Sequence, residues 1–283
     1  MSRILTISSW VCRGHVGNAA TTFPLMRRGH EVVSLPTVVL AHHPGHAPAP
    51  ARSAITDLAA IGRDGLGSPR PHPVDAVLVG YLADPAQAVA AADIVAQARA
   101  MTPGLPLLLD PVAGDAGRLY VAAQILEDIR THLLPIADIV TPNVTELVAL
   151  MDADRTGRAP QLGDAEIVHL ARRLGPPVVV VVTSAPPRRP DRMANLVVTP
   201  DSVTRIETPK IDVHVHGTGD LMAGLILSGL VNGDHVVPAT ATAAAIVHDV
   251  LETTRRLGDD EPAIVAAQSR FIRPLGQAEV SEL

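Results

Sequence analysis

The segment Gly217-Thr218-Gly219-Asp220 precedes the apolar run 221–230 and combines residue types that can transfer a phosphoryl group. Two glycines at the start of a helix leave backbone N–H groups uncovered, and the helix dipole adds partial positive charge, so an anion can bind there. A carboxylate beside that anion can take a proton from a hydroxyl as the hydroxyl attacks a phosphoryl group. The structural alternative is that Thr218 caps the helix and Asp220 is a first-turn acid favoured by the dipole.

Polar residues also follow most of the predicted strands, where open parallel sheets bind their ligands. Each one alone is typical of a turn or a helix cap, but together they favour a site along one edge of the sheet. They are Ser8, Ser9, Gly80, Tyr81, Asp110, Pro111, Thr141, Pro142, Asn143, Thr183 and Ser184, with Glu146 just beyond.

Three carboxylates, Asp110, Asp115 and Glu146, are expected on one rim of this site with Asp220 across from them. Close like charges are unfavourable without a cation, so the cluster predicts a magnesium ion that bridges nucleotide phosphates. A second reading of Glu146 is that it forms a variant capping box with Asn143 at the start of a helix. Both readings of Glu146 can hold together.

The order of elements that would carry these residues is β-α repeated. Apolar, β-branched runs predict strands, and Ala/Leu-rich runs between them predict helices. The predicted strands are 3–9, 31–40, 76–82, 105–110, 137–141 and 178–183, with an antiparallel pair at 196–199 and 203–207. The predicted helices are 16–28, 85–101, 119–133, 164–174, 220–230 and 237–256. This pattern indicates an α/β fold whose mostly parallel, doubly wound sheet has an antiparallel edge.

Composition excludes several classes of protein. A chain of 283 residues with 47% hydrophobic side chains can bury a large core, so one domain over 1–283 is expected. The net charge of −6 and scattered arginines give no footprint for nucleic acid. Single Cys12 allows no internal disulfide, and neither a signal peptide nor a membrane-spanning run is evident, so a soluble, cytoplasmic protein with no membrane partner is predicted.

By its motifs the chain resembles the pyridoxal kinases of the ribokinase-like superfamily. Gly-Thr-Gly-Asp and Thr-Pro-Asn-x-x-Glu are typical of the superfamily, whereas Gly-His-Val-Gly-Asn and the late Val-Ala-Ala-Gln are typical of pyridoxal kinases. The resemblance covers almost the whole chain through segments 7–18, 35–43, 80–81, 110–112, 141–146, 217–220 and 265–270.

The resemblance implies an ATP-dependent kinase that phosphorylates the 5′-hydroxymethyl group of pyridoxal. It implies that Asp220 is the general base and that Gly217, Thr218 and Gly219 form the anion hole. The nucleotide would be faced by Thr141, Asn143, Thr183, Ser184, Thr208, Pro209, Lys210 and Ile211. Asp115 and Glu146 match acids associated with Mg²⁺, Asp110 and Thr183 lie where the family places a monovalent cation such as K⁺, and Tyr120 follows the loop that closes over the phosphates. A homodimer is also implied.

The substrate side of the resemblance implies that Ser9 bonds the pyridoxal ring, that Tyr81 packs on it and that Val16 walls the pocket. Here the chain departs from the family, because Ala41-His42-His43-Pro44-Gly45-His46 stands where the family reads Ser-Asn-His-Thr-Gly-Tyr, and Trp10 replaces a histidine. Pro44 has no side-chain donor, so a ring contact must be lost or supplied by His43 or His46.

Two alternatives therefore stay open: a kinase for another hydroxymethyl compound such as hydroxymethylpyrimidine, or a non-catalytic protein that binds a vitamer or a nucleotide. The three loop histidines lack a nearby carboxylate or cysteine, which disfavours zinc. His216 can aid phosphate binding or lie on a strand surface with His214. Trp10 and Cys12 are expected in the core or the pocket wall rather than as nucleophiles.

Overall fold

The computed structural model describes residues 1–67, 71–151, 162–175 and 179–283. Its strands are β1 (Arg3–Val11), β2 (Glu31–Leu40), β3 (Arg52–Ala54), β4 (Ala76–Val79), β5 (Leu107–Leu109), β6 (Gly114–Asp115), β7 (Arg118–Leu119), β8 (Ile139–Val140), β9 (Val179–Ala185), β10 (Arg192–Val198), β11 (Val203–Pro209) and β12 (Glu279–Glu282). Its α-helices are α1 (Asn18–Arg27), α2 (Leu58–Gly67), α3 (Ala86–Met101), α4 (Ala123–Asp128), α5 (Val144–Met151), α6 (Asp164–Ala171), α7 (Thr218–Val231) and α8 (Val236–Leu257). None of the helices within the described ranges is long and apolar enough to cross a membrane.

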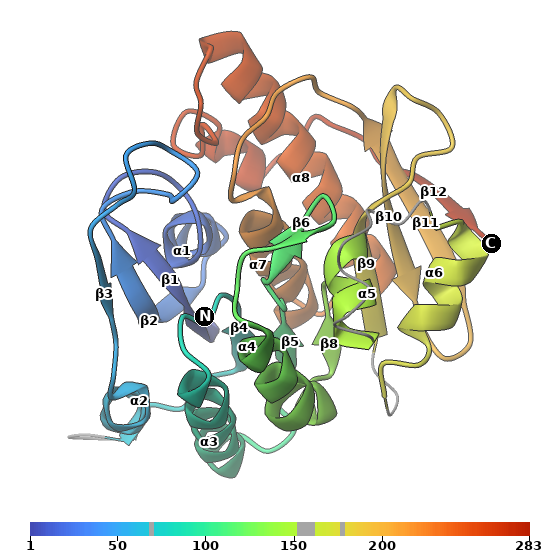
Figure 1. Cartoon of the computed structure of the whole chain (residues 1–283). Helices are drawn as coiled ribbons and strands as arrows, with labels where there is room; N and C mark the ends of the chain where they lie inside the picture. Colours follow the sequence, from blue (N-terminus) through green and yellow to red (C-terminus); the bar gives the residue numbers. More distant parts are fainter. Residues whose placement is uncertain (68–70, 152–161, 176–178) are drawn as a thin grey trace.

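Ten of the described strands form one sheet in the order β12-β11-β10-β9-β8-β5-β4-β1-β2-β3 (Figure 1). The six strands from β9 to β2 run parallel, whereas β3 pairs antiparallel on one edge and β10, β11 and β12 on the other. Every residue of β4 and β5 is buried. Continuous apolar strands of this kind are covered on both faces, which confirms the predicted parallel sheet with an antiparallel edge.

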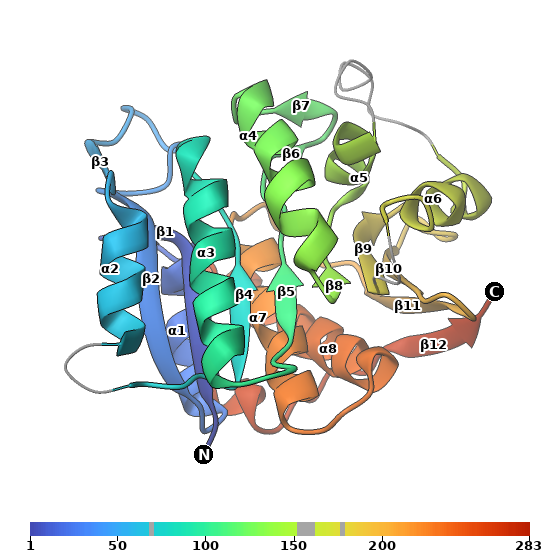
Figure 2. The ribbon, with the colours of Figure 1, turned by 90° about the horizontal axis from the view of Figure 1, so that it is seen from below.

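Helices cover both faces of the sheet (Figure 2). The core on one face packs residues of α2, α3, α4, α5 and α6 against the strands, and the core on the other face packs α1, α7 and α8. The connection after β1 therefore leaves toward one face and the connection after β4 toward the other. Neighbouring loops that diverge in this way open a crevice at the carboxyl ends of the two strands, where doubly wound sheets bind ligands.

The predicted elements agree best where the hydrophobic pattern is long. Strand 31–40 has the predicted bounds, and strands 196–199 and 203–207 form the longer antiparallel pair β10 and β11. Residue 178 of the predicted strand 178–183 lies outside the described residues.

The predicted helix 119–133 is wrong at its start, because Leu119 belongs to the β6–β7 hairpin and α4 begins only at Ala123. The hairpin turns at Ala116 and Gly117, which both have positive φ. A two-residue turn with this backbone fits the twist of a hairpin. Strands β3 and β12 and helix α2 were not predicted.

Candidate active site

The glycine-rich segment lies at the start of α7, as its sequence indicated. Gly217 is the N-cap residue with φ +92°, and the helix begins at Thr218. A side chain at Gly217 would collide with the backbone carbonyl of His15. Glycine is therefore required at this position both by its left-handed backbone and by the lack of space. The resulting turn leaves the first N–H groups of α7 open to an anion.

Asp220 lies in the first turn of α7, beside the backbone N–H of Gly17 at the start of α1. Desolvation by the surrounding protein raises the pKa of Asp220 from 3.8 to about 6, although hydrogen bonds from the backbone of Gly17 and of Asp220 itself oppose the shift. An ordinary first-turn acid faces water and the helix dipole, which would lower its pKa. A raised pKa near the working pH is what proton transfer needs.

Glu146 is held rigidly at the start of α5. Its Oε2 accepts the N–H of Asn143 at 2.9 Å while Asn143 Oδ1 accepts the N–H of Glu146 at 3.0 Å, which is the capping box expected from the sequence. Its Oε1 accepts the N–H of Ala113 at 2.9 Å and of Gly114 at 3.4 Å. Burial nevertheless raises the pKa of Glu146 to about 7, and the Asp115 charge adds to the shift.

Asp110 completes the acidic rim at the end of β5. It is buried and accepts the Thr141 hydroxyl at 3.0 Å. Its pKa is raised well above the ordinary value by burial first and then by the charges of Glu146 and Asp220. The pKa of the Tyr120 hydroxyl is raised by desolvation and then by the charges of all four carboxyl groups, so the four act on the same part of the site.

The residues assigned to the nucleotide lie along the neighbouring part of the same sheet edge. Asn143 pairs with Thr183 in a parallel bridge, and its side-chain amide donates to the carbonyl of Gly114 at 2.8 Å. Ser184 follows with φ +51°. Because β11 is antiparallel to β10 and β10 to β9, β11 runs parallel to β9. Residues 208–211 therefore end at the same edge as Thr183 and Ser184, with Thr208 buried and Pro209 and Lys210 exposed.

The residues assigned to the substrate gather at the crevice between β1 and β4. Ser8 Oγ accepts the N–H of Tyr81 at 3.0 Å, which ties the ends of the two strands together. Tyr81 packs against an apolar cluster that contains Val16, and Ser9 is buried near the end of β1 against Gly17. An apolar wall with a few polar groups at this position is typical of a small-molecule pocket.

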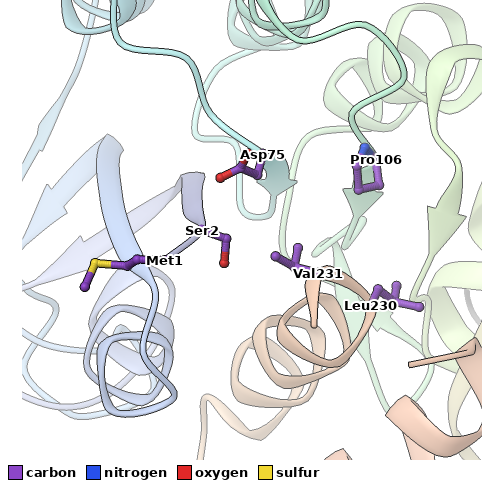
Figure 3. A pocket seen from close by; sticks show the side chains of 6 residues that line it. All are labelled: Met1, Ser2, Asp75, Pro106, Leu230 and Val231. Carbon is purple, nitrogen blue, oxygen red and sulfur yellow. The ribbon is translucent and has the colours of Figure 1, made fainter. Parts of the chain in front are cut away.

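A separate shallow cavity of about 440 Å³ lies at the opposite edge of the sheet (Figure 3). This cavity is lined by Met1 and Ser2 before β1, Asp75 before β4, Pro106 before β5, and Leu230 and Val231 at the end of α7. The Asp75 carboxylate already accepts the N–H of Arg3 at 2.7 Å. This cavity is at the amino ends of the parallel strands and has no part in the site described above.

Comparison with known proteins identifies the family. The family model for phosphomethylpyrimidine kinase matches residues 70–264. A pyridoxal kinase from Leifsonia xyli is 33% identical over 293 aligned residues, which cover 99% of each chain. A pyridoxal kinase from Rubrobacter xylanophilus is 36% identical over 96% of this chain and 94% of its own. The chain belongs to the pyridoxal kinase family.

The structural comparison agrees with this assignment to the pyridoxal kinase family. The pyridoxal kinase from Leishmania donovani, solved in complex with ADP and pyridoxamine, matches with a TM-score of 0.83 at 27% sequence identity and full coverage of both chains. The sheet order and the helices on its two faces are accordingly those of the ribokinase-like fold.

The loop that departs most from the pyridoxal kinase motif, residues 41–46, lies against the glycine-rich segment. The ring of His43 stacks on that of His216, with centroids 4.0 Å apart, and Pro44 is exposed. Desolvation, followed by the charges of neighbouring imidazoles, lowers the pKa of His43 to about 4. In the ranges that the structure describes, no group of three or more histidine, cysteine, aspartate or glutamate side chains is arranged to hold a metal ion.

Two residues at or near the site were missed in the sequence. Glu261 touches two loops of the site from the segment after α8, and Arg205 lies fully buried in β11 beside the nucleotide edge. No spacing signals either residue: Glu261 meets His15 and His46 only through long-range folding, and Arg205 reaches Asp164 and the carbonyl of Pro186 in the same way. Glu261 directly precedes the apolar stretch that leads into the Val-Ala-Ala-Gln motif, and that proximity was the available hint.

Proposed function

We propose that this chain transfers the γ-phosphoryl group of ATP to the 5′-hydroxymethyl group of pyridoxal and forms pyridoxal 5′-phosphate. The observation that carries the proposal is the position of Asp220: a carboxyl group with a raised pKa, in the first turn of α7 beside the open start of that helix, in a chain of the pyridoxal kinase family. Solved relatives that hold ADP with pyridoxamine support both a nucleotide and a vitamer as ligands.

In this mechanism the Asp220 carboxylate accepts the proton of the 5′-hydroxyl while the hydroxyl oxygen forms its bond to the γ-phosphorus and ADP leaves. With a pKa of about 6 the group is largely deprotonated at neutral pH yet more basic than an ordinary aspartate. The N–H groups of Gly217, Thr218 and Gly219 would hold the negative charge of the phosphoryl group during transfer. Residues Ser9, Val16 and Tyr81 would orient the ring, which turns the attack into an intramolecular event.

The charge of the acidic rim favours a magnesium ion that is held partly through water, because within the described residues no three of these carboxylates are arranged to hold a metal directly. Buried Glu146 and Asp110 both have raised pKa values, and the donors that bond them among the described residues are neutral, so a cation would relieve their repulsion. Three N–H groups already occupy the Glu146 carboxylate, which favours contact with magnesium through water, whereas the exposed Asp115 carboxylate would be open to direct coordination. When bound, magnesium supplies charge neutralisation at the phosphate oxygens.

Further parts of the proposal rest on the family resemblance. Thr141, Asn143, Thr183, Ser184 and residues 208–211 would face ATP, and Asp110 with Thr183 would hold a monovalent cation such as K⁺. A cytoplasmic homodimer, with one kinase domain over 1–283 in each copy, belongs to the same proposal. The continuous sheet from β12 to β3 supports the single domain.

One alternative substrate is favoured by a specific observation. The matching family model is named for phosphomethylpyrimidine kinase, and the 41–46 loop departs from the pyridoxal kinase motif on the side where the substrate is expected. The decisive experiment offers pyridoxal, pyridoxine, pyridoxamine and hydroxymethylpyrimidine in parallel with ATP, magnesium and potassium. ADP formation that depends on pyridoxal supports the proposal, and turnover of hydroxymethylpyrimidine alone supports the alternative. ATP binding without turnover of any alcohol would indicate a non-catalytic protein.

A further inference from the structure

Glu261 joins two loops of the site from a distant part of the chain. It lies between α8 and the C-terminal segment, and its side chain is 22% exposed. Its Oε2 accepts the backbone N–H of His15 at 3.0 Å. Its Oε1 lies 3.3 Å from Nε2 of His46. One carboxylate thus contacts both the loop between β1 and α1 and the loop after β2.

The contact between Glu261 and the His15 N–H is connected to the anion hole through the backbone. A side chain at Gly14 would collide with the Glu261 carboxylate, so the loop passes directly against it. The carbonyl of His15 in turn lies where a side chain of Gly217 would be. Glu261 therefore holds the residue whose carbonyl sets how close Gly217 and the start of α7 can approach β1.

The contact between Glu261 and His46 is connected to the anion hole through side chains. The His46 ring meets the His216 ring edge to face with centroids 6.3 Å apart, and the His43 ring stacks on His216 at 4.0 Å and meets His46 at 6.1 Å. His216 directly precedes Gly217. The 41–46 loop thus packs against the residue that precedes the anion hole, and Glu261 contacts the same loop at His46.

We propose that Glu261 is a positioning residue, which fixes the anion hole and the 41–46 loop relative to each other and so aligns the substrate hydroxyl with the phosphoryl group. It acts through His15 and His46 rather than by touching the reactants. The inference rests on the proposed kinase activity for its kinetic test. If Glu261 had a purely structural role, its loss would destabilise the whole fold and would change the kinetic constants for ATP and pyridoxal alike.

Three variants separate the two contacts. Glu261→Ala removes both, and because a misplaced reacting group can cost up to about 100-fold, kcat should fall between about tenfold and 100-fold while the KM for ATP stays constant. Glu261→Gln keeps an acceptor for the His15 N–H but loses the charge near His46. It should preserve kcat and raise the KM for pyridoxal about two- to fivefold, the size expected when one partly exposed contact with a carboxylate is lost. Asp260→Asn, which removes the adjacent exposed carboxylate, is the matched control and should leave all constants unchanged.

A double-mutant cycle tests the coupling. His46→Gln should reproduce the change in pyridoxal KM of Glu261→Gln, and the double variant should lose nothing more. NMR gives a readout that does not need turnover: the His15 amide resonance should move in Glu261→Ala, and the His46 ring resonances in both Glu261 variants.

The outcomes are distinct. The proposal is overturned if Glu261→Ala behaves like Asp260→Asn. It is also overturned if the activity and ATP affinity of Glu261→Ala fall together in proportion to the unfolded fraction of the protein, while Glu261→Gln and His46→Gln keep the wild-type KM for pyridoxal. Wild-type protein that phosphorylates no alcohol would contradict the proposed function instead. In that case unmoved His15 and His46 resonances would overturn the positioning role, and moved ones would support it.

Discussion

Replacement of Asp220 by asparagine should separate activity from stability, because the same burial that makes this carboxyl group a base also makes its charge costly. Asparagine has nearly the same shape and can still accept the N–H of Gly17, so the start of α7 should persist. It cannot accept a proton from the substrate hydroxyl. Loss of a general base typically costs about 10²- to 10⁴-fold, so kcat should fall by that factor while ATP still binds.

The stability change has a defined sign. The pKa of Asp220 is raised from 3.8 to about 6 in the folded chain, so the folded state binds this proton more tightly than the unfolded state. The free energy of unfolding therefore falls as the pH rises from about 4 to about 6. Above that range, ionised Asp220 lowers it by the full amount of about 3 kcal/mol. Asparagine never ionises. Asp220→Asn should accordingly be more stable than wild type by up to about 3 kcal/mol at about pH 8, and equal to it at about pH 4.

Urea unfolding at these two pH values, together with steady-state kinetics, measures both effects. Asp212→Asn removes an exposed carboxylate from the segment before α7 and serves as the control, which should change neither activity nor stability. Wild-type kcat in Asp220→Asn would refute the role of base. Equal stability at the higher pH would refute the argument that burial raises its pKa.

Three further results are expected. Glu146→Gln should raise the magnesium concentration for half-maximal rate about tenfold, as outer-shell changes do, and a normal magnesium titration would contradict its assignment. Arg205→Met should lower the free energy of unfolding by about 3–5 kcal/mol in urea, because buried Arg205 pairs with Asp164 and a second carboxylate, whereas Arg189→Met in an exposed pair should cost less than about 1 kcal/mol. Equal losses of unfolding free energy in these two arginine variants would contradict the larger contribution of the buried pair. Pro44→Thr, which restores a side-chain donor, should lower the KM for pyridoxal several-fold and leave that for ATP unchanged, and an unchanged pyridoxal KM would show that position 44 makes no ring contact.

Much of the fold follows from local patterns, because long apolar strands and helices carry their own periodicity. The bounds of β2 and the pairing of β10 with β11 were predicted from such patterns. Short elements were missed for a physical reason. Exposed β3 and β12 owe their strand conformation to pairing with a neighbour, and β6–β7 depends on positive φ at Ala116, which is uncommon for that residue.

The residues of the candidate site also differ in how far the sequence alone could predict them. Asp220 and Glu146 lie in motifs with a fixed relation to the start of a helix, so the sequence alone indicated both their positions and the capping contact of Glu146. The sequence could not indicate that Glu261 meets His15, because the two residues are 246 positions apart and no pattern links them. The stack of His43 on His216 depends likewise on the path of two loops.

The most direct test of the account is to incubate the protein with pyridoxal and ATP and to identify the product by mass, with Asp220→Asn alongside. The account predicts that the wild type forms pyridoxal 5′-phosphate in step with ADP and that the variant forms almost none. Folded, ATP-binding wild-type protein that leaves pyridoxal unphosphorylated would contradict it.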